Sequence, residues 1–485
     1  LRTLTGGLTS AADATINSVT VGKGANSVAG NTVLGESALD ASVTGGNNTA
    51  IGKEALTALT SGTRNSSVGG ETLQNLTTGD LNTCVGYTAG QDLTTGTGNT
   101  LIGSQAGKEL TTSSNNVAIG RNSLITATDS SGDNTAVGYQ ALMSNTTGDS
   151  NTAVGSGALD ANTTAGNNTA VGKDALGVNT TGASNVAVGD SALDANSTGD
   201  KNVGVGRNAI GANTTGSFNT SLGHSSLGNN TTASNNTAVG YHSLVENTTA
   251  SNNTAVGFEA LELNTTGANN TAVGTFALDS NTTASENTGI GYLALEENTT
   301  GESNTAVGAR ALDANTTAGH NTAVGRLALS ANTTGGFNTA LGSLALDSNT
   351  TASFNTGLGY KSLEANTTGA SNTAVGLHSL LKNTTASNNV AVGNNALAEN
   401  TTGASNTAVG ANALDAATTA NHNCAFGASA LGADTTGADN CAFGVAALAN
   451  NTTASNNTAF GRAALQENTT GTANVAVGSL ALDAN

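Results

Sequence analysis

The chain has 485 residues, with 64 glycines, no proline, no tryptophan and an aromatic fraction of 3%. A globular core of this size needs large side chains to fill its centre, so the composition favours a thin core repeated along an axis. The net charge of −19 disfavours binding to nucleic acid and to anionic membranes. No run of residues approaches the roughly 20 apolar residues of a membrane span, and three cysteines do not make a disulfide framework.

Residues 1–16 fit no repeat, and we expect them to form an irregular lead-in. Residues 17–485 are predicted to form one continuous repetitive structure. The chain begins at Leu1 rather than methionine and stops at Asn485 partway through a repeat. We therefore expect it to be the ordered part of a longer or processed polypeptide.

After the lead-in, the sequence repeats every 17 residues as Asn-Thr-Ala-Val-Gly-x-x-Ala-Leu-x-x-Asn-Thr-Thr-Gly-x-x. We number these positions 1 to 17, and we call the apolar residue at position 4 the anchor. The first anchor, Val21, lies 13 residues before the second, Leu34. One later interval is 18 residues, because the corner at residues 126–132 holds one extra residue. Counted in this way, the chain has 28 coils up to Val477.

Each coil contains two short apolar segments, Thr-Ala-Val and Ala-Leu, and both are too short for a helix. Small and β-branched residues bounded by asparagine and glycine are typical of strands. We therefore predict two strands and two turns per coil. A single coil cannot bury its apolar face, so the coils are expected to stack into an all-β, parallel β-solenoid.

Stacking turns each position into a column of equivalent neighbours. Position 1 is asparagine and position 5 is glycine in every coil from Asn31 and Gly35 onward. The glycine column indicates positive φ or close backbone approach. The asparagine column indicates side-chain amides that bond to the turn and to the next coil. Both columns are predicted to be structural, since no catalytic residue is needed in every coil.

The anchors are Val, Ile or Leu and then Phe426, Phe443 and Phe460, and we predict that they point into the core together with position 2. Position 3, between them, is nearly always small, so we expect it to face outward beneath a close neighbour, most simply a second copy of the chain. Leu at position 9 is predicted to be buried. Position 12 accepts either asparagine or leucine and is expected to point inward at a turn. The tyrosines at position 6 are expected to be exposed.

No residue is predicted to be catalytic, to bind a cofactor or to ligate a metal. The Gly-x-Gly fragments lack a strand–loop–helix context, and no calcium-binding loop is present. One column of aspartates is interpreted as a solvated edge: Asp160, Asp194, Asp313 and Asp347. The five histidines occupy non-core positions without metal-ligand spacing and are also interpreted as solvated surface: His224, His242, His320, His378 and His422.

Two further motifs have a chemical alternative. Cys424 and Cys441 lie one coil apart, within disulfide range, and a bond between them remains open beside the interpretation as free thiols. The Asn-Thr-Thr segments are formal N-glycosylation acceptors, but we interpret them as turn chemistry.

Over residues 16–485 the pattern Asn-Thr-Ala-Val-Gly…Ala-Leu…Asn-Thr-Thr-Gly resembles the head repeats of YadA-like trimeric autotransporter adhesins. It is more similar still to the shaft repeats of phage tail fibres, particularly those of cyanophages, and residues 16–25 resemble the entry to such a shaft. The resemblance implies a left-handed parallel β-roll in a side-by-side homotrimer, located in a virion tail fibre or at an extracellular cell surface. The coil is longer than in YadA-like heads.

We therefore expect a structural fibre protein, not an enzyme, whose rigid trimeric rod projects a receptor-binding element. A host-cell surface receptor would contact a part outside this chain, and neither nucleic acid nor membrane insertion is expected. An alternative is a trimeric adhesin whose lateral surface binds matrix or glycan. A solenoid polysaccharide lyase is disfavoured because such enzymes interrupt their coils with loops. An ice-binding solenoid is disfavoured because the threonine pair at positions 13 and 14 follows an asparagine at a corner.

Overall fold

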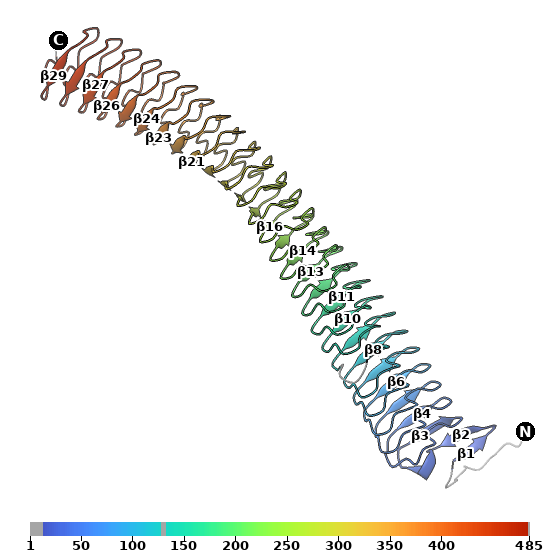
Figure 1. The fold of residues 1–485 in the computed structure, drawn as a ribbon. Helices are drawn as coiled ribbons and strands as arrows, with labels where there is room; N and C mark the ends of the chain where they lie inside the picture. The colour runs from blue at the N-terminus through green and yellow to red at the C-terminus, as the bar shows by residue number, and fades with distance from the viewer. Residues whose placement is uncertain (1–12, 128–131, 484–485) are drawn as a thin grey trace, which may run out of the picture. The chain divides into compact units, whose positions relative to one another are not determined.

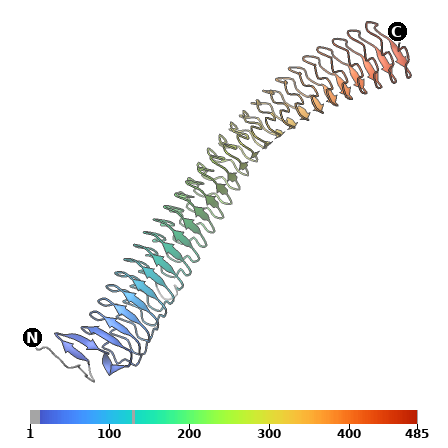
Figure 2. The ribbon, with the colours of Figure 1, turned by 180° about the vertical axis from the view of Figure 1, so that it is seen from behind.

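The computed structural model describes residues 13–127 and 132–483, which divide into two compact units, Leu1–Ala238 and Val239–Asn485. The described residues form an all-β chain with a parallel β-solenoid of about 26 turns and a 17-residue repeat. Within each unit the strand arrows form a row along one side, and the turn segments lie along the other (Figures 1 and 2). The predicted fold class is confirmed.

Every coil of the solenoid contributes one strand of three or four residues. In the first unit the strands are β1 (Ala14–Ile16), β2 (Val19–Gly22), β3 (Thr32–Gly35), β4 (Thr49–Ile51), β5 (Ser66–Val68), β6 (Thr83–Val85), β7 (Thr100–Ile102), β8 (Val117–Ile119), β9 (Thr135–Val137), β10 (Thr152–Val154), β11 (Thr169–Val171), β12 (Val186–Val188), β13 (Val203–Val205) and β14 (Thr220–Leu222). The unit boundary falls in β15 (Thr237–Val239). In the second unit they are β16 (Thr254–Val256), β17 (Thr271–Val273), β18 (Thr288–Ile290), β19 (Thr305–Val307), β20 (Thr322–Val324), β21 (Thr339–Leu341), β22 (Thr356–Leu358), β23 (Thr373–Val375), β24 (Val390–Val392), β25 (Thr407–Val409), β26 (Cys424–Phe426), β27 (Cys441–Phe443), β28 (Thr458–Phe460) and β29 (Val475–Val477).

The parallel stack begins at β3, because the segment around Val21 is not a coil. β1 pairs antiparallel with β2, and β2 pairs antiparallel with β3, through the short 3₁₀ turn η1 (Ala25–Ser27). The carboxylate of Asp13 accepts hydrogen bonds of 2.6 Å from the N–H groups of Lys23 and Gly24, which fixes this hairpin. The count of 28 coils was therefore too high. Residues 1–12 of the predicted lead-in lie outside the described residues.

Equivalent residues stand opposite each other in every described parallel strand pair, as Thr152 stands opposite Thr169. Between β8 and β9 the offset is 18, and Val117 pairs with Thr135. The extra residue belongs to the corner at 126–132, of which 128–131 lie outside the described residues. The insertion is thus absorbed in a corner, and the strand register continues unchanged.

The second apolar segment of the coil is not a strand, which corrects the prediction of two strands per coil. Ala141 and Leu142 are adjacent and both fully buried, whereas successive side chains of a strand point to opposite faces. Gln140 and Leu142 have positive φ values of 58° and 53°, and this left-handed alternation coils the segment into turns. Each such residue costs about 1–2 kcal/mol. Burial of the leucine and the 2.9 Å bond from its N–H to the carbonyl of Ala158 offset that cost.

The strand faces the opposite way from the prediction. Position 3 is fully buried, as at Ala136 and Ala153, whereas positions 2 and 4 are half-buried or exposed. The coil is so thin that the leucine at position 9 fills the space beneath the strand. A methyl group added at Gly204, a position 3 residue, would lie 3.3 Å from Leu193. The small column is therefore the core, and the anchors lie outside it.

The predictions for positions 5, 9 and 12 are confirmed. Gly138 has a φ of 141°, and a Cβ there would stand 2.3 Å from the carbonyl oxygen of Gly155. Position 9 leucines such as Leu142 are fully buried. At position 12, Asn145 is buried and its Nδ2 donates a 2.9 Å bond to the carbonyl of Gly148, while Leu59 fills the same place with an apolar side chain.

Candidate functional site

The most regular surface of each unit is the outward side of the strands, which we call the strand face and define as positions 2 and 4 of the coils. Position 2 is mostly threonine, and the anchors at position 4 are apolar. Leu341 is 44% exposed and Phe460 is 57% exposed. Toward the end of the second unit the rings of Phe426 and Phe443 stack with their centres 4.6 Å apart. Each unit therefore presents an apolar column to its surroundings.

The strand face carries no charge. From β3 to β29, no residue at position 2 or 4 is acidic or basic, although the chain contains 33 acidic and 14 basic residues. Contiguous exposed apolar surface is typical of interaction sites in soluble proteins. The prediction of a neighbouring chain over the alanine column is wrong in its location, since that column is buried. The anchors provide the surface on which a neighbour would pack.

Two internal columns of asparagine amides hold the coils together. At position 1, the N–H of Asn406 donates to Oδ1 of Asn389 at 2.9 Å, and Nδ2 of Asn406 donates to the carbonyl of Ala420 at 2.7 Å. At position 12, Nδ2 of Asn400 donates to Oδ1 of Asn383 at 3.0 Å. These side chains are fully buried. The predicted amide columns are confirmed, and the Asn-Thr-Thr asparagines at position 12 are not accessible to glycosylation.

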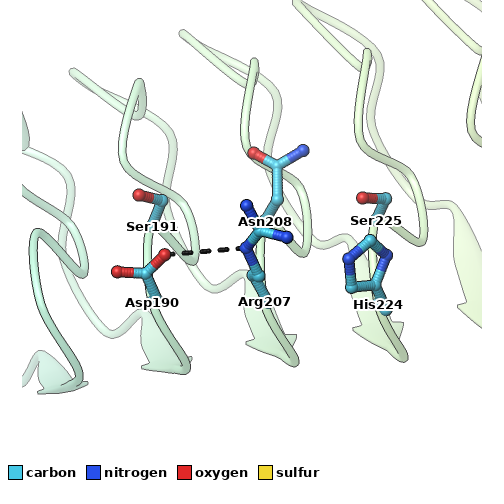
Figure 3. Close-up of a pocket in the computed structure, with 6 residues that line it drawn as sticks. All are labelled: Asp190, Ser191, Arg207, Asn208, His224 and Ser225. Carbon is cyan, nitrogen blue, oxygen red and sulfur yellow. Dashed lines mark ion pairs between the residues drawn. The ribbon is translucent and has the colours of Figure 1, made fainter.

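A small hollow of about 180 Å³ lies on the turn side of the first unit (Figure 3). It is lined at positions 6 and 7 of three consecutive coils by Asp190, Ser191, Arg207, Asn208, His224 and Ser225. Asp190 and Arg207 point toward each other, with Oδ2 and Nε 3.8 Å apart, and both side chains are more than half exposed. This arrangement suits weak polar contacts at a solvated surface. The exposure predicted for position 6, including all five tyrosines, is confirmed.

The column of aspartates at position 10 is less solvated than predicted. Burial raises the pKa of both Asp160 and Asp194. Asp313 is only 8% exposed, and its Oδ2 lies 2.8 Å from Nε of Arg310. Asp347 accepts a hydrogen bond from the hydroxyl of Ser330. The column runs along a half-buried groove beside the turn segments, so its carboxylates interact with neighbouring coils.

Four of the histidines lie as expected at the surface of separate coils. His224 lines the hollow, His320 stacks on Phe337, His378 lies beside Tyr360, and Nδ1 of His422 is 3.6 Å from Oδ1 of Asp439.

The fifth histidine, His242, belongs to a cluster that the sequence analysis missed. Its ring nitrogens and the carboxylates of Glu259 and Glu262 offer three ligand atoms that all lie within 4.8 Å of one another. Spacing was judged within one segment, whereas these residues are 17 and 20 apart. The signal was present in the repeat length, because an offset of 17 places residues in the same column.

Cys424 and Cys441 stand opposite each other in β26 and β27 and are free thiols in this structure. They occupy position 2, so they belong to the strand face and are half-buried. Burial, and then the neighbouring Cys441, raise the pKa of Cys424. Both thiols are therefore protonated at neutral pH and behave as small apolar groups of this face.

The chain matches no known protein-family model, and no curated protein matches it. Among the described residues, no helix is both long and apolar enough to span a membrane. The fold itself therefore defines the class: the chain is a parallel β-solenoid repeat protein with an uncharged, apolar strand face.

Proposed function

We propose that this chain is a structural fibre shaft, a rigid homotrimeric rod that carries a receptor-binding element away from its base on a virion or at a cell surface. The amide columns and the in-register strands support a mechanical role, because every coil is bonded to its neighbours by backbone and side-chain hydrogen bonds. The location at a virion or cell surface rests on the resemblance of the repeat to phage and adhesin repeats. The function is mechanical rather than catalytic.

The uncharged strand face is the observation that carries the trimer. Copies of a chain with a net charge of −19 repel one another wherever their charged surfaces meet. The strand face avoids this repulsion and offers a column of exposed aliphatic and aromatic side chains. Packing these columns around a common axis would bury them and leave the charged turn segments in solvent. A second copy of the chain is therefore the occupant that fits this face.

Native mass spectrometry of the intact chain, together with light scattering, tests the proposal. We expect a particle of three times the 46.9 kDa chain mass. The double variant Leu341→Lys/Leu358→Lys places two charges on the strand face, where the native side chains are 44% and 40% exposed. It should dissociate the trimer and leave the β signal in circular dichroism intact.

The matched control is Leu377→Lys, since Leu377 lies at position 6 and is equally exposed, at 43%. This variant should remain trimeric. A wild-type chain that is monomeric at micromolar concentration would contradict the proposal, and so would equal dissociation of both variants.

Ice binding is a second candidate, because the orientation of the strand removes the objection raised from sequence. Threonine at position 2 points outward from each strand and alternates with the anchor at position 4 across a regular face, as at Thr305 and Val307. This function requires the strand face to be free, so it excludes the trimer. An assay for inhibition of ice recrystallisation on a monomeric preparation would distinguish the two candidates.

A further inference from the structure

The second unit contains a cluster of one imidazole and two carboxylates on its turn side. His242 and Glu259 occupy position 7 of consecutive coils, and Glu262 lies at position 10 of the second coil. Nδ1 of His242 is 3.5 Å from Oε1 of Glu262, and the ligand atoms of all three residues lie within 4.8 Å of one another. The cluster is therefore built by the register of the solenoid and not by a local loop.

The backbone and a row of rings hold the cluster in place. The N–H of Glu259 donates to the carbonyl of Tyr241 at 3.0 Å, which ties the two coils together beside the cluster. The ring of Tyr241 stacks on His242 at 3.9 Å and on Phe258 at 5.4 Å. Phe258 contacts Phe276 edge-on at 5.5 Å. This wall orients the imidazole and shields one side of the cluster from water, which strengthens electrostatic attraction there.

A third carboxylate, Asp279, follows one coil further along position 10. The carbonyl of Asp279 accepts a 3.1 Å bond from the N–H of Leu263, so the two coils are directly adjacent. Oδ1 of Asp279 is buried and receives no hydrogen bond from any described residue. Burial, and then the charges of Glu262 and Glu259, raise the pKa of Asp279 to about 7.

The negative charge of this cluster is not balanced by nearby cations. Among the described residues, no lysine or arginine forms an ion pair with Glu259, Glu262 or Asp279. The nearest basic side chain along these columns, Arg310, pairs with Asp313 at 2.8 Å. A buried carboxylate oxygen without a partner, beside two further carboxylates, is a site at which a cation would gain strong interactions.

We propose that His242, Glu259 and Glu262 bind a first-row divalent cation of the Zn²⁺ type, with Asp279 as the fourth ligand. A neutral imidazole nitrogen combined with carboxylate oxygens favours Zn²⁺ over Mg²⁺ or Ca²⁺, which prefer oxygen alone. Zinc bonds of about 2.1 Å place tetrahedral ligand atoms roughly 3.4 Å apart. The 3.5 Å separation of Nδ1 of His242 and Oε1 of Glu262 already matches that distance.

The bound ion would join three consecutive coils, because its ligands come from the coils of His242, Glu259 and Asp279. Positions 7 and 10 belong to the turn segments and not to the strand face. The site is therefore independent of the proposed trimer and stands whether the chain is monomeric or assembled.

Isothermal titration of the full-length chain with ZnCl₂, after treatment with a chelator, tests the site. We expect the wild type to bind one Zn²⁺ per chain that is lost, or bound at least about tenfold more weakly, in His242→Gln and in Glu262→Gln. The melting temperature of the wild type should rise with Zn²⁺, and that of the two variants should rise less. MgCl₂ at the same concentrations should not compete.

The matched control is His378→Gln, because His378 occupies position 7 of the same unit beside Tyr360 but lacks a carboxylate cluster. Its zinc isotherm should equal that of the wild type. Circular dichroism of each variant shows that it is folded. A wild type without a zinc site, or identical isotherms for the His242→Gln and His378→Gln variants, would overturn the proposal, and full affinity in Asp279→Asn would remove Asp279 from the ligand set.

Discussion

The backbone N–H of Asn406 donates a 2.9 Å hydrogen bond to the side-chain oxygen of Asn389, its counterpart one coil earlier. Nδ2 of Asn389 donates at 2.9 Å to the carbonyl of Gly403 at the corner of its own coil. One side chain thus satisfies a buried donor in the following coil and a buried acceptor in its own corner. No aliphatic side chain can replace it, which explains why position 1 is asparagine throughout the solenoid.

Removing one rung of this column should be costly. Asn389→Ala leaves the N–H of Asn406 and the carbonyl of Gly403 buried without partners, at about 1–3 kcal/mol for each group. We expect a loss of about 2–4 kcal/mol in the free energy of unfolding, measured by urea denaturation. Asn394→Ala, at an exposed position of the same coil, is the control and should change stability by less than about 0.5 kcal/mol. Equal effects of the two substitutions would contradict the role assigned to the column.

Adjacent glycines in the first unit should differ sharply in their tolerance of a methyl group. Gly69 has a φ of 141°, and a Cβ there would lie 2.3 Å from the carbonyl oxygen of Gly86. A Cβ at Gly70 would meet nothing closer than the ring of Tyr87, at 3.5 Å. We expect Gly69→Ala to destabilise the chain by about 3 kcal/mol or more and Gly70→Ala to be nearly neutral. Thermal unfolding of the two variants measures the difference, and similar melting temperatures would refute it.

Asp434 replaces asparagine in the position 12 column and should make stability depend on pH. Burial raises the pKa of this fully buried carboxyl to about 7, against an ordinary value of 3.8. The neutral form is therefore favoured in the folded chain. Its contribution is complete below about pH 4 and is lost as the pH rises through 7, for a total on the order of 3–4 kcal/mol.

The variant Asp434→Asn keeps the bond geometry but removes the charge. It should match the wild type at pH 5 and exceed it in melting temperature at pH 8. Asp190→Asn, whose native side chain is about half exposed, serves as the control and should follow the wild type at both values. A variant that melts with the wild type at pH 8 would show that Asp434 is not strained by ionisation.

The same column contains a gap that can be filled. Oδ1 of Asn400 is buried and accepts no hydrogen bond from the described residues, because the next coil has Ala417 at position 12. Ala417→Asn would supply an Nδ2 donor, as Asn400 itself does for Asn383. We expect a gain of about 1 kcal/mol in the free energy of unfolding, largest when combined with Asp434→Asn. Ala416→Asn, one residue earlier and partly exposed, is the control. Loss of stability in Ala417→Asn would show that the gap is too small for an amide.

The sequence by itself determined the features that follow from repetition. A constant 17-residue interval places each side chain against its counterpart, so the parallel register, the asparagine and glycine columns and the absorption of the extra residue near 126–132 could all be predicted. These properties depend only on the spacing along the chain and on the bonding capacity of each residue type. The exposure of position 6 followed from its variability.

Only the tertiary structure decided which way the strand faces and what lies opposite it. In a three-residue strand the alternation Thr-Ala-Val is compatible with either face inward, and hydrophobicity favoured the wrong one. The space beneath the strand is already occupied by position 9. Leu101 shows this competition, since methyl groups added at Gly90 and Gly107, the position 9 residues of the neighbouring coils, would both lie 2.8 Å from its side chain.

The same limit hid the cluster around His242. A column can be assigned from spacing, but the proximity of positions 7 and 10 in neighbouring coils depends on the left-handed turns of the second apolar segment. Those turns arise because two adjacent side chains must both enter a core only one side chain thick. Packing across the coil, which no one-dimensional pattern contains, therefore set the inside, the outside and the chemistry between them.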